Sequence, residues 1–144
     1  MYAPLSRFVE PTYAIMRVVV GLLFAFHGAQ KLFGVLDGTA RPIVSLMGLA
    51  GIIELTAGLF VMIGLLAGVA AFIASGQMAC AYFLAHAPRS GWPIQNDGEL
   101  AVLLCFLFLF ISARGAGMWS VDAMLFRHRA PMPAASHSEG WSRA

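Results

Sequence analysis

Charged residues are scarce in this chain, which argues against most classes of soluble protein. Only 11% of its 144 residues are Asp, Glu, Lys or Arg, whereas 60% are hydrophobic. A soluble domain carries about 25% charged residues, many of which its surface needs for contact with water. The net charge of +2 is too small and too dispersed to indicate a nucleic-acid partner. The composition therefore predicts an integral membrane protein that contacts the lipid bilayer.

Cysteine is also rare, and the motifs of common redox cofactors are missing. Cys80 and Cys105 form neither a CxxC motif nor a set with metal-ligand spacing. They are predicted at similar depth, as a redox pair or as two small buried apolar residues, of which the second is the commoner case. The sequence has no haem signature, no iron–sulfur cysteine set and no dinucleotide fingerprint. We therefore predict no metal site, and electrons would have to come from a partner or a bound substrate.

Long apolar segments are what the chain does have. There are four of them, at about residues 12–33, 46–66, 67–87 and 98–112. About 20 helical residues cross a hydrocarbon core of ~30 Å, and a helix pairs all its own backbone groups there. Gly64 and Gly68 are expected to form the tight turn between the second and third spans. The pattern predicts an all-α fold, an integral membrane four-helix bundle formed by residues 1–126.

The distribution of cations predicts the orientation of this bundle. An even number of spans places both termini on one side, with five arginines: Arg7, Arg114, Arg127, Arg129 and Arg143. The other side has Lys31, Arg41 and Arg89. This bias predicts cytoplasmic N- and C-termini. The apolar stretch Val18–Phe26 resembles the core of a signal peptide. We expect it to be retained, because cleavage there would discard one of four similar spans.

The C-terminal region is predicted to lie outside the membrane core. Ser120 can cap a short amphipathic helix at the membrane surface, with Asp122 in its first turn. Trp119 suits the aromatic belt of the interface. Residues 127–144 are polar and rich in Pro and Ser, so we expect a flexible cytoplasmic tail.

Polar residues inside the spans are the candidate functional residues. One stripe of the first helix is defined by spacings of four and three residues: Arg17, Gly21, Phe24, Gly28 and Lys31. Glycines on such a stripe let a neighbouring backbone approach closely, so the stripe should face other helices. Glu54 of the second span lies on one face with Gly51 and Gly58. These three glycines (Gly28, Gly51 and Gly58) are predicted to be structural, as are Trp119, Ser120 and Asp122.

We expect the polar side chains of separate spans to converge in one charge-compensated pocket. Arg17 and Lys31 would oppose two carboxylates, those of Glu54 and Glu99, because buried charges require compensation. The predicted cofactor-binding set is Arg17, His27, Gln30, Glu54, Asn96 and Glu99. The candidate catalytic residues are His27, Lys31 and Glu54.

Structural roles would also explain several of these residues. Lys31 could extend to the membrane interface, and His27 could bond a carbonyl across helices. Asn96 and Glu99 have the spacing of a helix N-cap and its capping-box partner. Glu54 is the strongest functional candidate, because a carboxylate in mid-span is costly unless it is protonated or paired.

The order of motifs resembles that of the DoxX family. The motifs are Arg17 early in the first span, then "FHGAQKLFG", "GIIELTAGLFVMIGL", "NDGEL" and "GAGMWSVDAML", which together cover residues 17–125. Val121 departs from the family's usual G-x-G-x-W-S-L-D ending. The resemblance implies a four-helix bacterial inner-membrane protein. Founding members of the family are associated with terminal quinol oxidases and with thiosulfate:quinone oxidoreductase.

Three functions are compatible with these observations. The first is an accessory subunit of quinone-linked electron transfer or of a membrane oxidoreductase complex, with a quinone or another small lipophile as ligand. His27 and Glu54 would then exchange protons, and Lys31 would stabilise a negatively charged oxygen. The second is a non-catalytic anchor that recruits a partner protein or a second copy of the chain. The third is a small proton-linked transporter, although four short helices leave little room for alternating access.

Overall fold

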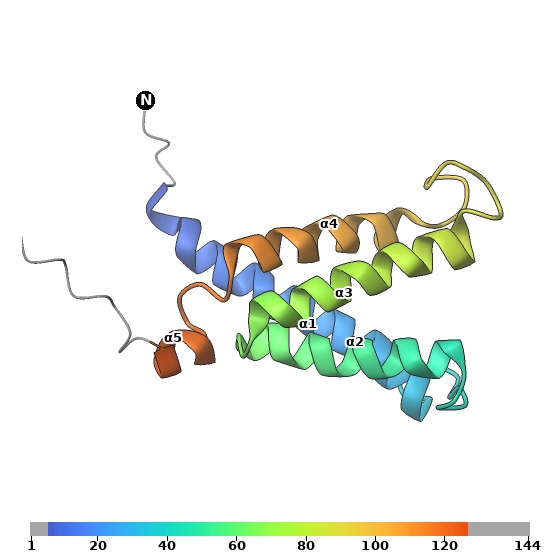
Figure 1. Cartoon of the computed structure of the whole chain (residues 1–144), viewed down its shortest axis with the longest axis horizontal. Coiled ribbons are helices and arrows are strands. Elements are labelled where there is room, and N and C mark those ends of the chain that lie inside the picture. The colour runs from blue at the N-terminus through green and yellow to red at the C-terminus, as the bar shows by residue number, and fades with distance from the viewer. Residues whose placement is uncertain (1–5, 127–144) are drawn as a thin grey trace, which may run out of the picture.

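The computed structural model describes residues 6–126, all of whose regular structure is helical. A single turn, Ser6–Phe8, precedes helix α1 (Val9–Phe33), and α2 (Leu46–Ile63) and α3 (Ala67–Ala81) follow. Helix α3 continues as a π-helical turn, η2 (Tyr82–His86), before α4 (Glu99–Arg114) and the short α5 (Val121–Phe126). Figure 1 shows these elements in order. The predicted all-α class is therefore confirmed, while the proposed tail, residues 127–144, lies outside the described residues.

Three of the described helical segments are long and apolar enough to cross a membrane: Ser6–Phe33, Leu46–Ile63 and Ala67–His86. Helix α4 has 16 residues and therefore rises about 24 Å, less than the ~30 Å core. The sequence had also indicated that the fourth span is the shortest. The boundaries differ from the prediction at the start of α1, which begins at Val9 and not at residue 12, and at the end of α2.

The prediction that the second span reaches residue 66 is wrong, because Gly64 ends α2 at Ile63. Gly64 has a φ of 72°, in the left-handed region that ends many helices. Gly68 is not part of the turn, since it lies inside α3; Leu66, with a φ of 46°, occupies the turn instead. At the other end of α3, the last turn is π-helical, and π-helical turns are frequent at functional sites.

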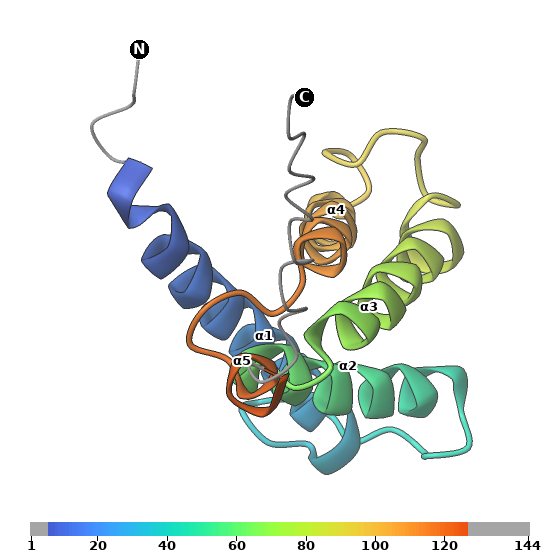
Figure 2. The ribbon, with the colours of Figure 1, turned by 60° about the vertical axis from the view of Figure 1, so that its left-hand side comes forward.

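The four long helices pack as two pairs, α1 with α2 and α3 with α4. Helices α2 and α3 join at residues 64–66 and diverge from there, as Figures 1 and 2 show. We call the end with this turn the hairpin end, and the opposite end, with loops 34–45 and 87–98, the loop end. Phe24 of α1 contacts Phe108 of α4, with ring centroids 4.6 Å apart. The core thus joins the two pairs, while space remains between them toward the loop end.

Glycine and alanine make these close pairs possible. A Cβ built on Gly21 would lie 2.5 Å from the Met62 nitrogen, and one on Gly58 would lie 2.6 Å from the Ala25 nitrogen. The α3–α4 pair uses buried alanines of α3 in the same way: Ala67, Ala70, Ala71 and Ala74. Lipid removes most of the hydrophobic drive for helix association, so backbone proximity of this kind holds membrane helices together.

Candidate functional site

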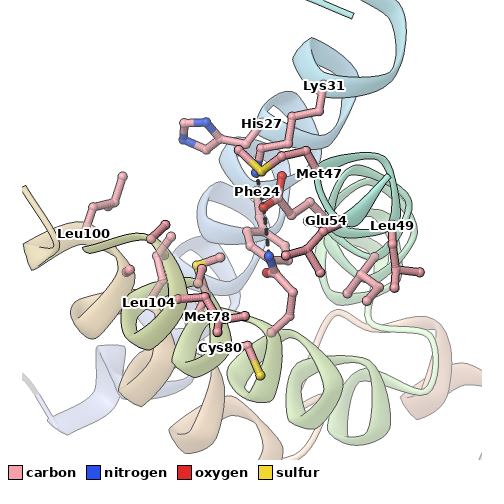
Figure 3. Close-up of a pocket in the computed structure, with 18 of the residues that line it drawn as sticks. Phe24, His27, Lys31, Met47, Leu49, Glu54, Met78, Cys80, Leu100 and Leu104 are labelled. Carbon is pink, nitrogen blue, oxygen red and sulfur yellow. Dashed lines mark hydrogen bonds and ion pairs between the residues drawn. The ribbon is translucent and has the colours of Figure 1, made fainter. Parts of the chain in front are cut away.

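A cavity lies between the two helix pairs at the loop end. It has a volume of about 570 Å³, and residues of all four long helices line it. Its wall is mostly apolar, with side chains such as Phe24, Met47, Met78 and Leu104 (Figure 3). We call this space the cleft. Its size and apolar lining are typical of small-molecule sites, which measure about 300–1,000 Å³.

A buried ion pair forms the polar part of the cleft. The Glu54 side chain is 1% exposed, and its Oε1 accepts a hydrogen bond from the Lys31 ammonium. The same oxygen accepts a second bond, of 3.1 Å, from Nε2 of Gln77. Helices α1, α2 and α3 therefore meet at one carboxylate oxygen (Figure 3). A buried carboxylate with a cation and an amide on it has the compensation that burial requires.

The glycine contacts explain why Lys31 and Glu54 meet. A Cβ on Gly28 would lie 2.3 Å from the Leu55 nitrogen, so the α1 backbone touches α2 next to Glu54. A Cβ on Gly51 would lie 3.0 Å from the Lys31 Cβ. Because both helices lack side chains at these positions, a lysine on one can reach a carboxylate on the other.

Four further polar side chains line the cleft: His27, Cys80, His86 and Asp97. His27 is exposed toward the cleft side of α1, and the described residues offer its ring no hydrogen bond. His86, in the π-helical turn, lies with Nδ1 3.0 Å from the Asn96 carbonyl oxygen. Neither His86 nor Gln77 is among the candidate residues predicted from the sequence. The signal for Gln77 was its position as the one amide in an Ala-rich span.

Arg17 does not belong to this pocket, which corrects the predicted set. Its guanidinium is fully buried near the hairpin end and donates to the carbonyls of Val61 at 2.5 Å and Met62 at 2.8 Å. A third bond, of 2.8 Å, reaches the carbonyl of Trp119. The carbonyls at the end of α2 carry the negative end of its dipole, so they help to compensate the cation, which has no hydrogen bond to a carboxylate among the described residues.

Gln30, Asn96 and Glu99 also lie apart from the ion pair. Gln30 donates to the Leu36 carbonyl at 2.8 Å, within the loop that follows α1. The buried Asn96 side chain donates to Ser90 and accepts from the Gly98 nitrogen, also at 2.8 Å, so its own loop satisfies it. Glu99 is exposed at the first position of α4, and no side chain caps that helix. The polar residues thus form separate groups, because loop carbonyls and amides are nearer partners than distant helices.

The cysteines also differ from the prediction. Cys80 is exposed and lines the cleft, whereas Cys105 is half-buried beside Ser75, and both are free. Cys80 is therefore not a small buried residue of the core. The described residues contain no group of three or more His, Cys, Asp or Glu side chains that could hold a metal ion.

Residues 119–122, which precede and begin α5, form hydrogen bonds that stabilise the hairpin end together with Arg17. The Asp122 carboxylate accepts from the backbone nitrogens of Leu66 at 2.9 Å and Ala67 at 3.2 Å, at the start of α3. Ser120 Oγ accepts from the Ala123 nitrogen at 3.1 Å and so caps α5. We call this set of bonds the clasp. It joins α1, the α2–α3 turn and α5 at the hairpin end (Figure 1).

We expect replacement of Asp122 by alanine to lower the free energy of unfolding by about 1–2 kcal/mol, because two nitrogens at the start of α3 lose their acceptor. Asp122→Asn keeps one acceptor oxygen and should lose about half as much. Thermal unfolding of the detergent-solubilised protein measures both. A wild-type melting temperature for Asp122→Ala would contradict the assigned role.

Comparison with known proteins finds one family model and a curated relative. The family model DoxX matches residues 12–87. A protein from Haemophilus influenzae, carrying the name "Uncharacterized protein", is 36% identical over 121 residues. The alignment covers 79% of this chain and 90% of that relative. No solved structure matches the chain.

Proposed function

Because the chain belongs to the DoxX family of membrane proteins, we propose that its cleft binds a quinone or a similar small lipophile. In this proposal the protein is an accessory subunit of quinone-linked electron transfer in the bacterial inner membrane. The observation that carries it is the apolar cleft of about 570 Å³ with a buried Lys31–Glu54 pair in its wall. Such a site suits a ligand with an apolar body and a small polar head.

The polar side chains of the cleft suit the chemistry of a quinone head group. A quinol loses two protons and two electrons when it is oxidised, so its site needs proton acceptors close to the ring oxygens. Glu54 and the exposed His27 supply them from two different helices. The Lys31 side chain is 27% exposed, and its ammonium can donate to a ring oxygen that carries negative charge. A partner subunit would receive the electrons.

The proposal also assigns the cleft to one side of the membrane. The arginine bias puts the termini in the cytoplasm, so the hairpin end with its clasp lies on the cytoplasmic side. The cleft then opens in the outer half of the membrane. Its position between diverging helices would let a lipophile enter sideways from the bilayer.

We expect Glu54→Gln to weaken binding of a short-tailed quinone analogue about tenfold or more, because the Lys31 ammonium loses the carboxylate that holds it in place. His27→Ala should weaken binding less. Glu99→Gln is the matched control, since it removes an exposed carboxylate at the loop end, outside the cleft. Titration calorimetry on the full chain in lipid nanodiscs measures the affinities. Wild-type affinity in both Glu54→Gln and His27→Ala would overturn the proposal.

A second candidate, a membrane anchor for a soluble partner, has support from α5. The clasp fixes this helix, and it presents Met124 and Leu125, which are 78% and 60% exposed. Co-purification at fixed stoichiometry would decide between the two functions. A partner retained by Glu54→Gln and His27→Ala, but lost when Met124 and Leu125 become serine, supports the anchor.

A further inference from the structure

Two buried oxygen atoms beside the ion pair lack a hydrogen-bond donor among the described residues. They are Oε2 of Glu54 and Oε1 of Gln77. Native proteins pair nearly all such atoms, so two unpaired acceptors on side chains already bonded to each other call for an explanation. Both side chains line the cleft. A ligand bound in the cleft could supply the hydrogen-bond donor that these two oxygens lack.

The bonds at Glu54 account for the position of these two acceptors. Its Oε1 takes both donors, the Lys31 ammonium and the Gln77 amide, which leaves Oε2 unpaired. The amide of Gln77 must point its nitrogen at Glu54, since the opposite arrangement would place two acceptor oxygens 3.1 Å apart. Gln77 therefore has its own oxygen left over. The Lys31 ammonium, with three N–H groups, has donors to spare for a ligand oxygen.

We propose that Glu54 and Gln77 form a seat for a hydroxyl group on the apolar ring of the ligand, and that Gln77 determines specificity there. A hydroxyl donates to one of the two unpaired oxygens and accepts from Lys31 at the same time. A quinone carbonyl only accepts, so it leaves both oxygens unpaired. The inference rests on the proposed function, and it adds that the hydroquinone binds more tightly than the quinone.

Access to the seat requires the movement of a flexible side chain. Both oxygens are covered, although their side chains reach the cleft wall. Met47, which is drawn next to Lys31 in Figure 3, is unbranched and can change rotamer without moving the backbone. The ligand head would thus displace a side chain and not a helix.

A matched ligand series tests the seat. The series has one ring and one short alkyl tail, as the hydroquinone, the quinone and the hydroquinone dimethyl ether. Affinities for the full chain in lipid nanodiscs are measured by titration calorimetry without oxygen. We expect the hydroquinone to bind about tenfold or more tightly than the other two, as a hydrogen bond to a charged group contributes that much. Gln77→Leu should reduce this preference severalfold.

Gln30→Leu is the control, because Gln30 bonds a loop carbonyl outside the cleft and should keep the wild-type preference. Equal wild-type affinity for all three ligands would overturn the hydroxyl seat and leave the proposed function standing. Binding of none of them would overturn the proposed function itself. An undiminished preference in Gln77→Leu would remove the role of Gln77. The wild-type series needs no variant, so the inference is testable even if Gln77→Leu does not fold.

Discussion

Arg17→Met is expected to lower the free energy of unfolding by about 3 kcal/mol or more, one of the two largest losses that we predict for this protein. The guanidinium is fully buried and donates to three carbonyls, on two residues of α2 and on Trp119. The Val61 carbonyl also accepts from the Gly64 nitrogen, but the Met62 and Trp119 carbonyls lose the Arg17 donor, and each such loss in a buried site costs about 1–3 kcal/mol. Methionine fills much of the same volume, so the loss reports the hydrogen bonds and not a cavity. Thermal unfolding in detergent measures it.

The same substitution at an exposed arginine provides the control for Arg17→Met. Arg89 is 60% exposed, and its nearest carboxylate oxygen, on Asp97, is 3.8 Å away. Arg89→Met should therefore change the unfolding free energy by no more than about 0.5 kcal/mol. Arg17→Lys should fall between wild type and Arg17→Met, because one ammonium cannot reach all three carbonyls as a planar guanidinium does. Equal stability of Arg17→Met and Arg89→Met would show that the clasp does not hold the hairpin end.

Much of the fold could be predicted from sequence because membrane helices obey simple constraints. The length of each apolar run predicted a span, and the glycine stripe predicted which face of α1 points into the bundle. Glu54 was expected in the interior, since a lone carboxylate in a span cannot face lipid cheaply. The structure buries it against Lys31. Each of these inferences depends on the sequence pattern of one helix or on the contact between two neighbouring helices.

The predicted pocket was wrong for residues whose hydrogen-bond partners are uncharged. Matching cations with carboxylates does not take such partners into account. Charge compensation suggested a carboxylate for Arg17, but the partners are backbone carbonyls, which every residue has. Asn96 and Gln30 bond within their loops, whose conformations the sequence pattern does not define.

The role of Gln77 depends on the rotation of α3 about its own axis. An Ala-rich helix with little amphipathic contrast gives no sequence signal for that rotation. The cleft itself follows from the divergence of two helix pairs, which is a property of the assembled bundle.

Gly28→Ala should destabilise the protein by about 3 kcal/mol or more, although it adds a single methyl group. That carbon would lie 2.3 Å from the Leu55 nitrogen and 2.7 Å from the Gly51 oxygen, both of them backbone atoms that no rotamer change can move. Overpacking a core with flexible neighbours costs about 1–3 kcal/mol, and here the two helices must separate. Separation at this level also lengthens the Lys31–Glu54 contact, so we expect binding of the quinone analogue to fall together with stability.

The control for Gly28→Ala is the same substitution in the middle of α3. A Cβ built on Gly76 meets no atom within 4 Å, so Gly76→Ala adds a good helix former without a clash. It should stabilise the protein by about 0.5–1 kcal/mol. The two substitutions thus have opposite predicted signs, which thermal unfolding resolves even if the magnitudes differ from these values. A stabilising Gly28→Ala would mean that α1 and α2 do not touch next to Glu54, and the geometry of the cleft would have to be revised with it.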